Sequence, residues 1–133
     1  MLGKIHLYLG ILVIVIFLLT GQYMHHNFDH LKDMELMNRA LFRAGHLYIL
    51  LFGLINVSLG THFRISNINF LNRVQLFGSV IILIATFLII YGFFTELPTE
   101  EIERPLTRNS LYLILFGVSI HGIVSLIMKR KNE

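Results

Sequence analysis

Charge is scarce in this chain, and cysteine and tryptophan are absent. Of its 133 residues only 14% are charged, whereas 55% are hydrophobic. Without cysteine the chain can form no disulfide, thiolate metal site or cysteine nucleophile. Without tryptophan, an aromatic belt at a membrane surface has to consist of tyrosine and phenylalanine. Nucleotide-binding loops and serine-elbow motifs are missing too, so the common soluble enzyme classes are not indicated.

Long apolar runs fill most of the sequence. Four of them, at about 5–23, 40–60, 74–94 and 110–128, are long enough to cross a bilayer, which takes about 20 residues. They lack the alternating pattern of barrel strands, and backbone groups in lipid must be paired within the protein, so helices are expected. The sequence therefore predicts an all-α membrane protein, in which residues 1–133 form one domain, a four-helix transmembrane bundle in the lipid bilayer.

Four spans place both termini on one side of the membrane. Lys and Arg number six on that side and five on the other, and positive residues favour the cytoplasm. We therefore expect both termini in the cytoplasm, with the chain in the inner membrane of a bacterium. The basic segment Lys129-Arg130-Lys131 is interpreted as a topology anchor, and no nucleic-acid partner is expected.

The pattern of the second predicted helix indicates that it begins well before its apolar run. Apolar and histidine positions recur at three-four spacing: His30, Met34, Met37, Leu41, Ala44, Tyr48, Leu51 and Ile55. Asp29 precedes them as a candidate N-cap. A helix from His30 to Gly60 would be about 46 Å long and would overhang the bilayer by roughly 15 Å on the non-cytoplasmic side. Such a helix with an apolar seam needs a partner.

Two segments resemble each other. Residues 47–53 read Leu-Tyr-Ile-Leu-Leu-Phe-Gly, and residues 111–117 read Leu-Tyr-Leu-Ile-Leu-Phe-Gly. They lie in the second and fourth predicted helices, which run in the same direction. The likeness indicates either duplication of a helix pair or chance among common apolar residues.

Two strongly polar side chains, Asn56 and His121, fall deep inside predicted spans. Polar groups in hydrocarbon are costly, so each is a candidate functional residue. Both lie about 18 Å below the outer face of their helices, a depth that allows a hydrogen bond between them. Two interpretations remain open: the pair fixes helix packing, or Asn56 and His121 form a cofactor-binding or proton-relay site.

Histidine supplies two cofactor hypotheses. Seven histidines in a small bundle indicate b-type haem as one cofactor, with His121 as a ligand, because helical bundles hold haem between axial histidines. Since no other histidine is predicted at the depth of His121, the pattern also argues against haem. The second hypothesis is copper or zinc at the outer face, bound by His26, Asp29, His30 and Met34. The alternative is that these histidines are solvated and the methionine belongs to the apolar seam.

Charged residues at the outer end suggest an interface. Arg39 and Arg43 are spaced to share one helix face, and acidic residues lie on the same side of the membrane, so an Arg–Glu latch is predicted with Glu100, Glu101 and Glu103. Because little reactive chemistry is buried, we expect a non-catalytic protein acting by association, as an accessory subunit or a homo-oligomer. The alternatives are a redox or metal protein, and a proton or small-solute conduit through Asn56 and His121.

Overall fold

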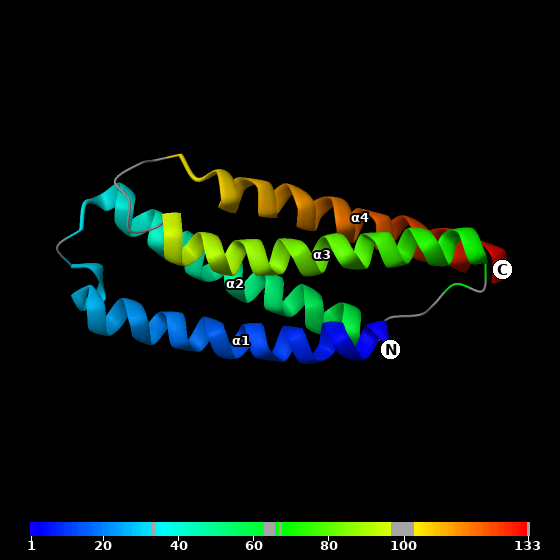
Figure 1. The fold of residues 1–133 in the computed structure, drawn as a ribbon, viewed down its shortest axis with the longest axis horizontal. Coiled ribbons are helices and arrows are strands. Elements are labelled where there is room, and N and C mark those ends of the chain that lie inside the picture. The colour runs from blue at the N-terminus through cyan, green and yellow to red at the C-terminus, as the bar shows by residue number, and fades with distance from the viewer. Residues whose placement is uncertain (33, 63–65, 67, 97–102, 133) are drawn as a thin grey trace.

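The computed structural model describes residues 1–32, 34–62, 66, 68–96 and 103–132. In these residues it contains four long helices, α1 (Leu2–Asn27), α2 (Leu36–His62), α3 (Asn69–Glu96) and α4 (Pro105–Asn132), and a short 3-10 turn η1 (Asp29–Leu31). Each long helix has the length and apolar composition needed to cross a membrane. The prediction of an all-α protein with four helices that could each span a membrane is therefore confirmed. The helices run alongside one another, and both termini lie at the same end (Figure 1).

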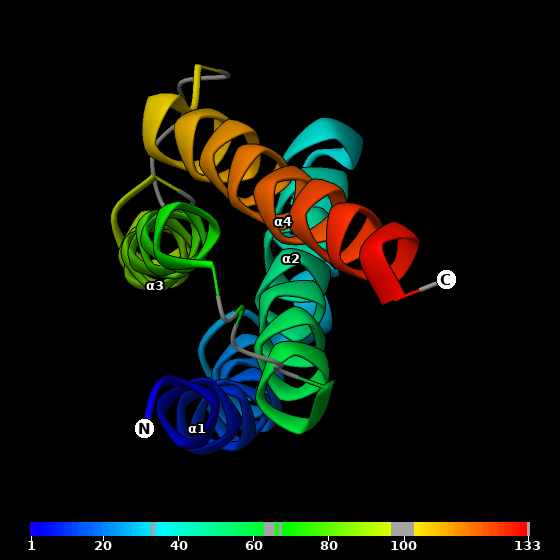
Figure 2. The ribbon, with the colours of Figure 1, turned by 90° about the vertical axis from the view of Figure 1, so that its right-hand side faces the viewer.

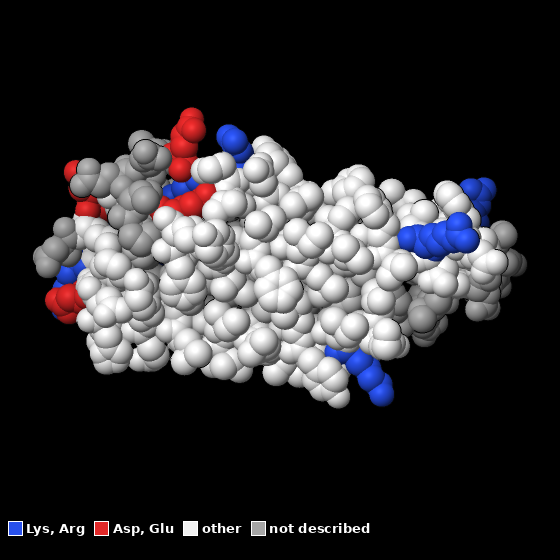
Figure 3. All heavy atoms as spheres, viewed as in Figure 1, with Lys and Arg blue, Asp and Glu red and all other residues white. Residues whose placement is uncertain are grey.

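The surface shows why these helices suit a bilayer. In the face drawn in Figure 3 the middle of the molecule carries no charged side chain, whereas Lys, Arg, Asp and Glu gather at the two ends. The acidic side chains visible there lie at the end opposite the termini. Large apolar side chains such as Leu18 of α1 and Leu126 of α4 are exposed. An apolar surface of this kind matches lipid rather than water.

The helices pack mainly as two hairpins, α1 with α2 and α3 with α4, and α2 joins the hairpins through a smaller contact with α3. Glycines set the closest approach in each hairpin. A Cβ on Gly10 would lie 2.6 Å from the Val57 nitrogen and 2.9 Å from the Gly53 oxygen. A Cβ on Gly117 would lie 2.9 Å from the Gly78 oxygen. Small residues thus allow the helix backbones to touch, as is common between helices in membranes.

The two similar segments end at equivalent places in the fold. Gly53 closes the first segment and faces Val13 and Ile14 of α1, and Gly117 closes the second and faces Gly78 and Ile82 of α3. The final glycine of each segment is therefore where the second helix of a hairpin crosses the first. The likeness in sequence corresponds to a shared packing requirement.

The start of the second helix differs from the prediction. The structure begins α2 at Leu36 rather than at His30, and its length of 27 residues falls between the 26 of α1 and the 28 of α3 and α4. The helix is interrupted because Asp29 and Leu31 have left-handed backbone conformations, with φ of 41° and 63°. Such conformations are uncommon for residues other than glycine. Burial of the Leu31 side chain in the core, at 3% exposure, favours the turn.

The two hairpins are displaced along the long axis of the molecule. In Figure 1, α3 and α4 extend beyond the start of α1 at the end that carries the termini. Viewed along that axis, α4 crosses obliquely over α2 and packs beside α3, whereas α1 lies apart from α4 (Figure 2). This displacement decides which polar side chains meet inside the bundle.

Candidate functional site

A buried polar network joins the first three helices. His6 Nδ1 of α1 donates to Asn56 Oδ1 of α2 at 2.7 Å, and Asn56 Nδ2 donates to Thr86 Oγ1 of α3 at 2.9 Å. The side chains of His6, Asn56 and Thr86 are all 0% exposed. Asn56 Nδ2 also donates to the Phe52 oxygen, and Thr86 Oγ1 donates to the Ile82 oxygen. Asn56 thus uses both donor hydrogens and its acceptor oxygen, as a buried amide must.

A second polar contact joins α3 to α4. His121 Nε2 lies 3.0 Å from Ser79 Oγ, and Ser79 is fully buried. His6 and His121 are close enough for an electrostatic interaction between them. The two sets of contacts, together called the polar region below, involve side chains of all four helices.

The predicted pairing of Asn56 with His121 differs from these contacts. In the hydrogen bonds that the structure describes, Asn56 is joined to His6 and Thr86, and His121 is joined to Ser79. Counting residues from the helix ends placed Asn56 and His121 at one level, but α4 is displaced along the axis relative to α2 (Figure 1). The same displacement brings His6 near His121, which the predicted depths had separated. Sequence reasoning therefore identified both residues and missed their partners.

No family model, curated protein or solved structure matches this chain. The function therefore has to be argued from the side chains themselves, because a fold alone does not define an activity. The polar region offers hydrogen-bond donors and acceptors and two histidine rings, but no cysteine nucleophile. Its chemistry suits the joining of helices, the binding of a metal or haem by imidazole, or proton transfer.

A third histidine contact lies nearer the opposite end. His46 Nδ1 of α2 is 2.9 Å from Thr20 Oγ1 of α1, and the Thr20 hydroxyl donates to the Phe17 oxygen. The imidazole of His46 stacks on the Phe17 ring with centroids 4.1 Å apart. His46 has no partner predicted from the sequence. A signal was present, since threonine at a helix-interior position of a span needs a hydrogen bond as histidine does.

The outer residues predicted to bind a metal do not lie along one helix. His26 belongs to α1 and is exposed, Asp29 begins η1 and pairs with Lys32 at 3.7 Å, and Met34 packs against the core. The side chain of His30 lies outside the described part of the structure. Because the chain turns at η1, the four residues are not helical neighbours, contrary to the spacing argument. Within the described residues, no group of three His, Cys, Asp or Glu side chains is arranged to hold a metal.

The described residues of the predicted Arg–Glu latch either make other contacts or are exposed. Arg39 Nη2 donates to the Lys32 oxygen at 2.7 Å and to the Met34 oxygen at 3.2 Å, so Arg39 holds the turn between α1 and α2. Arg43 and Glu103 are exposed. Glu100 and Glu101 lie outside the described residues, and the latch with them stays a prediction.

Glu96 is a buried carboxylate that falls just beyond the predicted third span, 74–94. It is the last residue of α3, is 8% exposed, and accepts hydrogen bonds from the first turn of α4. The Leu106 nitrogen donates to Oε1 at 2.5 Å, and both the nitrogen and the hydroxyl of Thr107 donate to Oε2. A carboxylate satisfies the free N–H groups of a helix start and is attracted to its positive end. Glu96 therefore fixes the start of α4.

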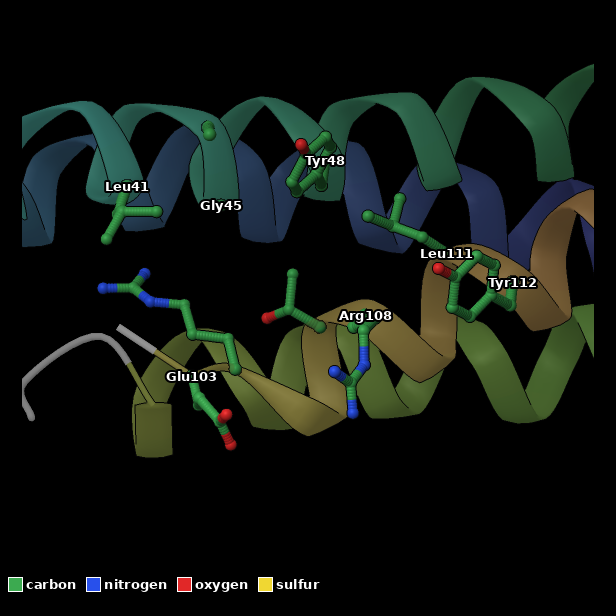
Figure 4. A pocket seen from close by; sticks show the side chains of 10 residues that line it. Leu41, Gly45, Tyr48, Glu103, Arg108, Leu111 and Tyr112 are labelled. Atoms are coloured by element: carbon green, nitrogen blue, oxygen red, sulfur yellow. The ribbon is translucent and has the colours of Figure 1, made fainter. Parts of the chain in front are cut away.

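Beside this contact, α2 and α4 enclose a pocket of about 470 Å³. Leu41 projects from α2 towards α4, whereas the side chains of Glu103 and Arg108 point away from α2 (Figure 4). Arg104, just before α4, also lines the pocket. Burial lowers the pKa of the Arg104 guanidinium, and the nearby charge of Glu96 opposes this shift. The pocket thus combines an apolar wall with a partly desolvated cation.

Proposed function

We propose that this chain is a small polytopic membrane protein that acts by association, either as an accessory subunit of a membrane complex or as a homo-oligomer. We place it in the bacterial inner membrane with both termini in the cytoplasm. In this proposal the His6–Asn56–Thr86 and Ser79–His121 contacts fix the packing of the helices. The protein itself catalyses no reaction.

The observation that carries the proposal is how the buried polar groups are used. Asn56 and Thr86 each bond both to a neighbouring helix and to a carbonyl of their own helix. Groups engaged in this way hold helices together, and polar contacts of this kind stabilise helix association in membranes. The pocket between α2 and α4 is lined by other residues than these. The network therefore supports a structural role more directly than a reactive one.

The outer faces of the bundle supply the surface for association. Only 17% of the most apolar window of α1 and 22% of that of α4 is buried within the chain, compared with 44% for α3. The remaining apolar surface suits lipid and also suits the helices of another subunit or a second copy. Helix α1 and helix α4 are therefore the elements that we expect at an interface.

Counting subunits in membranes tests the proposal. The chain, fused to a fluorescent protein at its C-terminus, would be examined by single-molecule photobleaching in native membranes and purified in mild detergent. We expect either two or more bleaching steps per spot or one stoichiometric partner in the purified complex. A single bleaching step together with purification of a lone monomer would contradict the proposal. A membrane protein known to be monomeric, expressed at the same level, is the control for chance overlap.

A redox role with b-type haem near His121 is a second candidate. One observation favours it: the displacement of the hairpins brings a second histidine, His6, near His121. Haem iron bound by two imidazoles would give a visible spectrum and about one iron per chain. We expect that spectrum to be lost in His121→Ala and kept in His62→Ala, because His62 is exposed at the end of α2. Purified protein that shows neither visible absorbance nor bound iron would exclude this candidate. Elemental analysis of the same protein would also detect bound copper or zinc, the metals predicted at His26.

A further inference from the structure

The pocket between α2 and α4 contains two hydrogen-bond donors that find no acceptor among the described residues. Arg104 Nε and Nη2 are buried from solvent and have no hydrogen-bond partner within the part of the chain that the structure describes. These two nitrogens form one edge of the guanidinium, where their N–H bonds run side by side. This edge is the fork that binds the two oxygens of a carboxylate or phosphate. Buried donors are normally satisfied, so the fork points to a bound oxyanion.

Among the described residues, the charges around the fork do not supply this acceptor. Glu96 interacts electrostatically with Arg104, but its described hydrogen bonds come from Leu106 and Thr107 at the start of α4. Glu103 lines the same pocket, yet its carboxylate points away from α2, as the Arg108 guanidinium does (Figure 4). Within the described part of the chain, the fork therefore lacks a pair of acceptor oxygens on the pocket side.

The position and walls of the pocket indicate the kind of molecule that carries those oxygens. Arg104 directly precedes Pro105, the first residue of α4, so the fork lies where a spanning helix meets the membrane surface. Away from Arg104 the pocket is lined by Leu41, Ala44, Tyr48, Leu111 and Tyr112. Tyrosines at this level are typical of the interface with lipid headgroups. An oxyanion at the surface with an apolar portion reaching inward is the chemistry of a phospholipid.

We propose that this pocket is a specific phospholipid site, in which the Arg104 fork binds the phosphate and the apolar wall formed by α2 and α4 contacts the start of an acyl chain. Its volume of about 470 Å³ holds the phosphate and glycerol region of one lipid. The site belongs to the leaflet on the side opposite the two termini. This proposal goes beyond the association proposed above and does not depend on it.

Native mass spectrometry of the full chain in mild non-ionic detergent tests the site. The probes are dioleoyl phosphatidylglycerol, dioleoylglycerol without a phosphate, oleate, and inorganic phosphate. We expect one phosphatidylglycerol per chain at concentrations where dioleoylglycerol and inorganic phosphate do not bind. Arg104→Gln should lower the affinity for phosphatidylglycerol about tenfold, because it removes a charge-assisted bidentate contact. Arg43→Gln should leave the affinity unchanged, since Arg43 is exposed and is not part of the pocket lining.

Several results would overturn the proposal. Equal affinity in Arg104→Gln and wild type would remove the fork from the site. Binding of oleate or inorganic phosphate as tight as that of phosphatidylglycerol would show that the fork does not select a phospholipid. If Arg104→Gln fails to fold, Ala44→Phe provides the second variant, because it fills the pocket and leaves the guanidinium in place. Phosphatidylglycerol binding that survives in Ala44→Phe would also contradict the proposal.

Discussion

His6 Nδ1 lies 2.7 Å from Asn56 Oδ1, and this contact joins α1 to α2 inside the apolar part of the bundle. Asn56 in turn reaches Thr86 of α3, so a single amide connects three helices. Replacement of Asn56 by leucine should remove these contacts and lower the free energy of unfolding by about 1–2 kcal/mol. Thermal unfolding in detergent would measure the change.

A double-mutant cycle separates this pairing from a general loss of packing. His6→Leu and Asn56→Leu should show an interaction energy of about 1 kcal/mol, because each removes the same hydrogen bond. Thr20→Val provides the control partner for Asn56→Leu, since Thr20 lies about 21 Å along α1 from His6 and bonds to His46. Additive effects of His6→Leu and Asn56→Leu would show that the two side chains do not act together.

The glycine contacts give a second prediction. A Cβ on Gly60 would lie 2.5 Å from the backbone nitrogen of Leu7, which cannot move without shifting α1, whereas a Cβ on Gly122 would meet nothing within 4 Å. Gly60→Ala should therefore destabilise the bundle by about 1–3 kcal/mol through overpacking. Gly122→Ala should leave stability unchanged or raise it by up to about 1 kcal/mol, because alanine favours a helix more than glycine does. Both changes are made within helices and add one methyl group, so a similar loss in thermal stability for both would refute the proposed close contact.

The spans could be predicted from sequence and the polar partners could not, for one physical reason. Whether a segment such as 74–94 crosses a bilayer depends on its own length and composition, which are local properties. Whether Asn56 meets His6 or His121 depends on how far one hairpin is displaced along the other, and no local pattern records that displacement. The sequence was therefore sufficient to identify Asn56 and His121 as polar residues within the spans, and it was not sufficient to assign their contacts.

The turn after α1 and the role of Glu96 could not be predicted from the sequence for a related reason. The segment from Met24 to Arg43 contains no glycine or proline, so its pattern favoured an unbroken helix. The left-handed conformation of Leu31 accompanies the burial of its side chain, and that burial depends on tertiary packing. Glu96 accepts hydrogen bonds from the backbone N–H groups of Leu106 and Thr107, and even the nearer of these lies ten residues away in sequence. The sequence signature of a helix cap places the capping residues only three positions apart, so it does not detect this contact.

The carboxylate of Glu96 yields a third prediction. Glu96→Gln keeps the shape of the side chain but removes the charge that attracts the helix start, so it should lower the free energy of unfolding by about 1–2 kcal/mol. Hydrogen exchange at the amides of Leu106 and Thr107 should accelerate, because both donate to this carboxylate. Glu103→Gln is the matched control, since Glu103 is exposed. Unchanged exchange at both amides in Glu96→Gln would contradict the capping role.

The turn between α1 and α2 gives the last prediction. Arg39 Nη2 donates to the carbonyls of Lys32 and Met34, which lie on the chain segment that reverses direction before α2. Arg39→Ala should free both carbonyls and favour local opening by about 1 kcal/mol, which corresponds to roughly fivefold faster hydrogen exchange. The amides to observe are those of Leu31, Lys32 and Met34, whose hydrogen bonds form the turn. Arg43→Ala, an exposed position one turn further along α2, should leave these rates unchanged. Since the opening is local, the thermal stability of the bundle should hardly change; a large loss of global stability in Arg39→Ala would instead show that the turn and the bundle unfold as one unit.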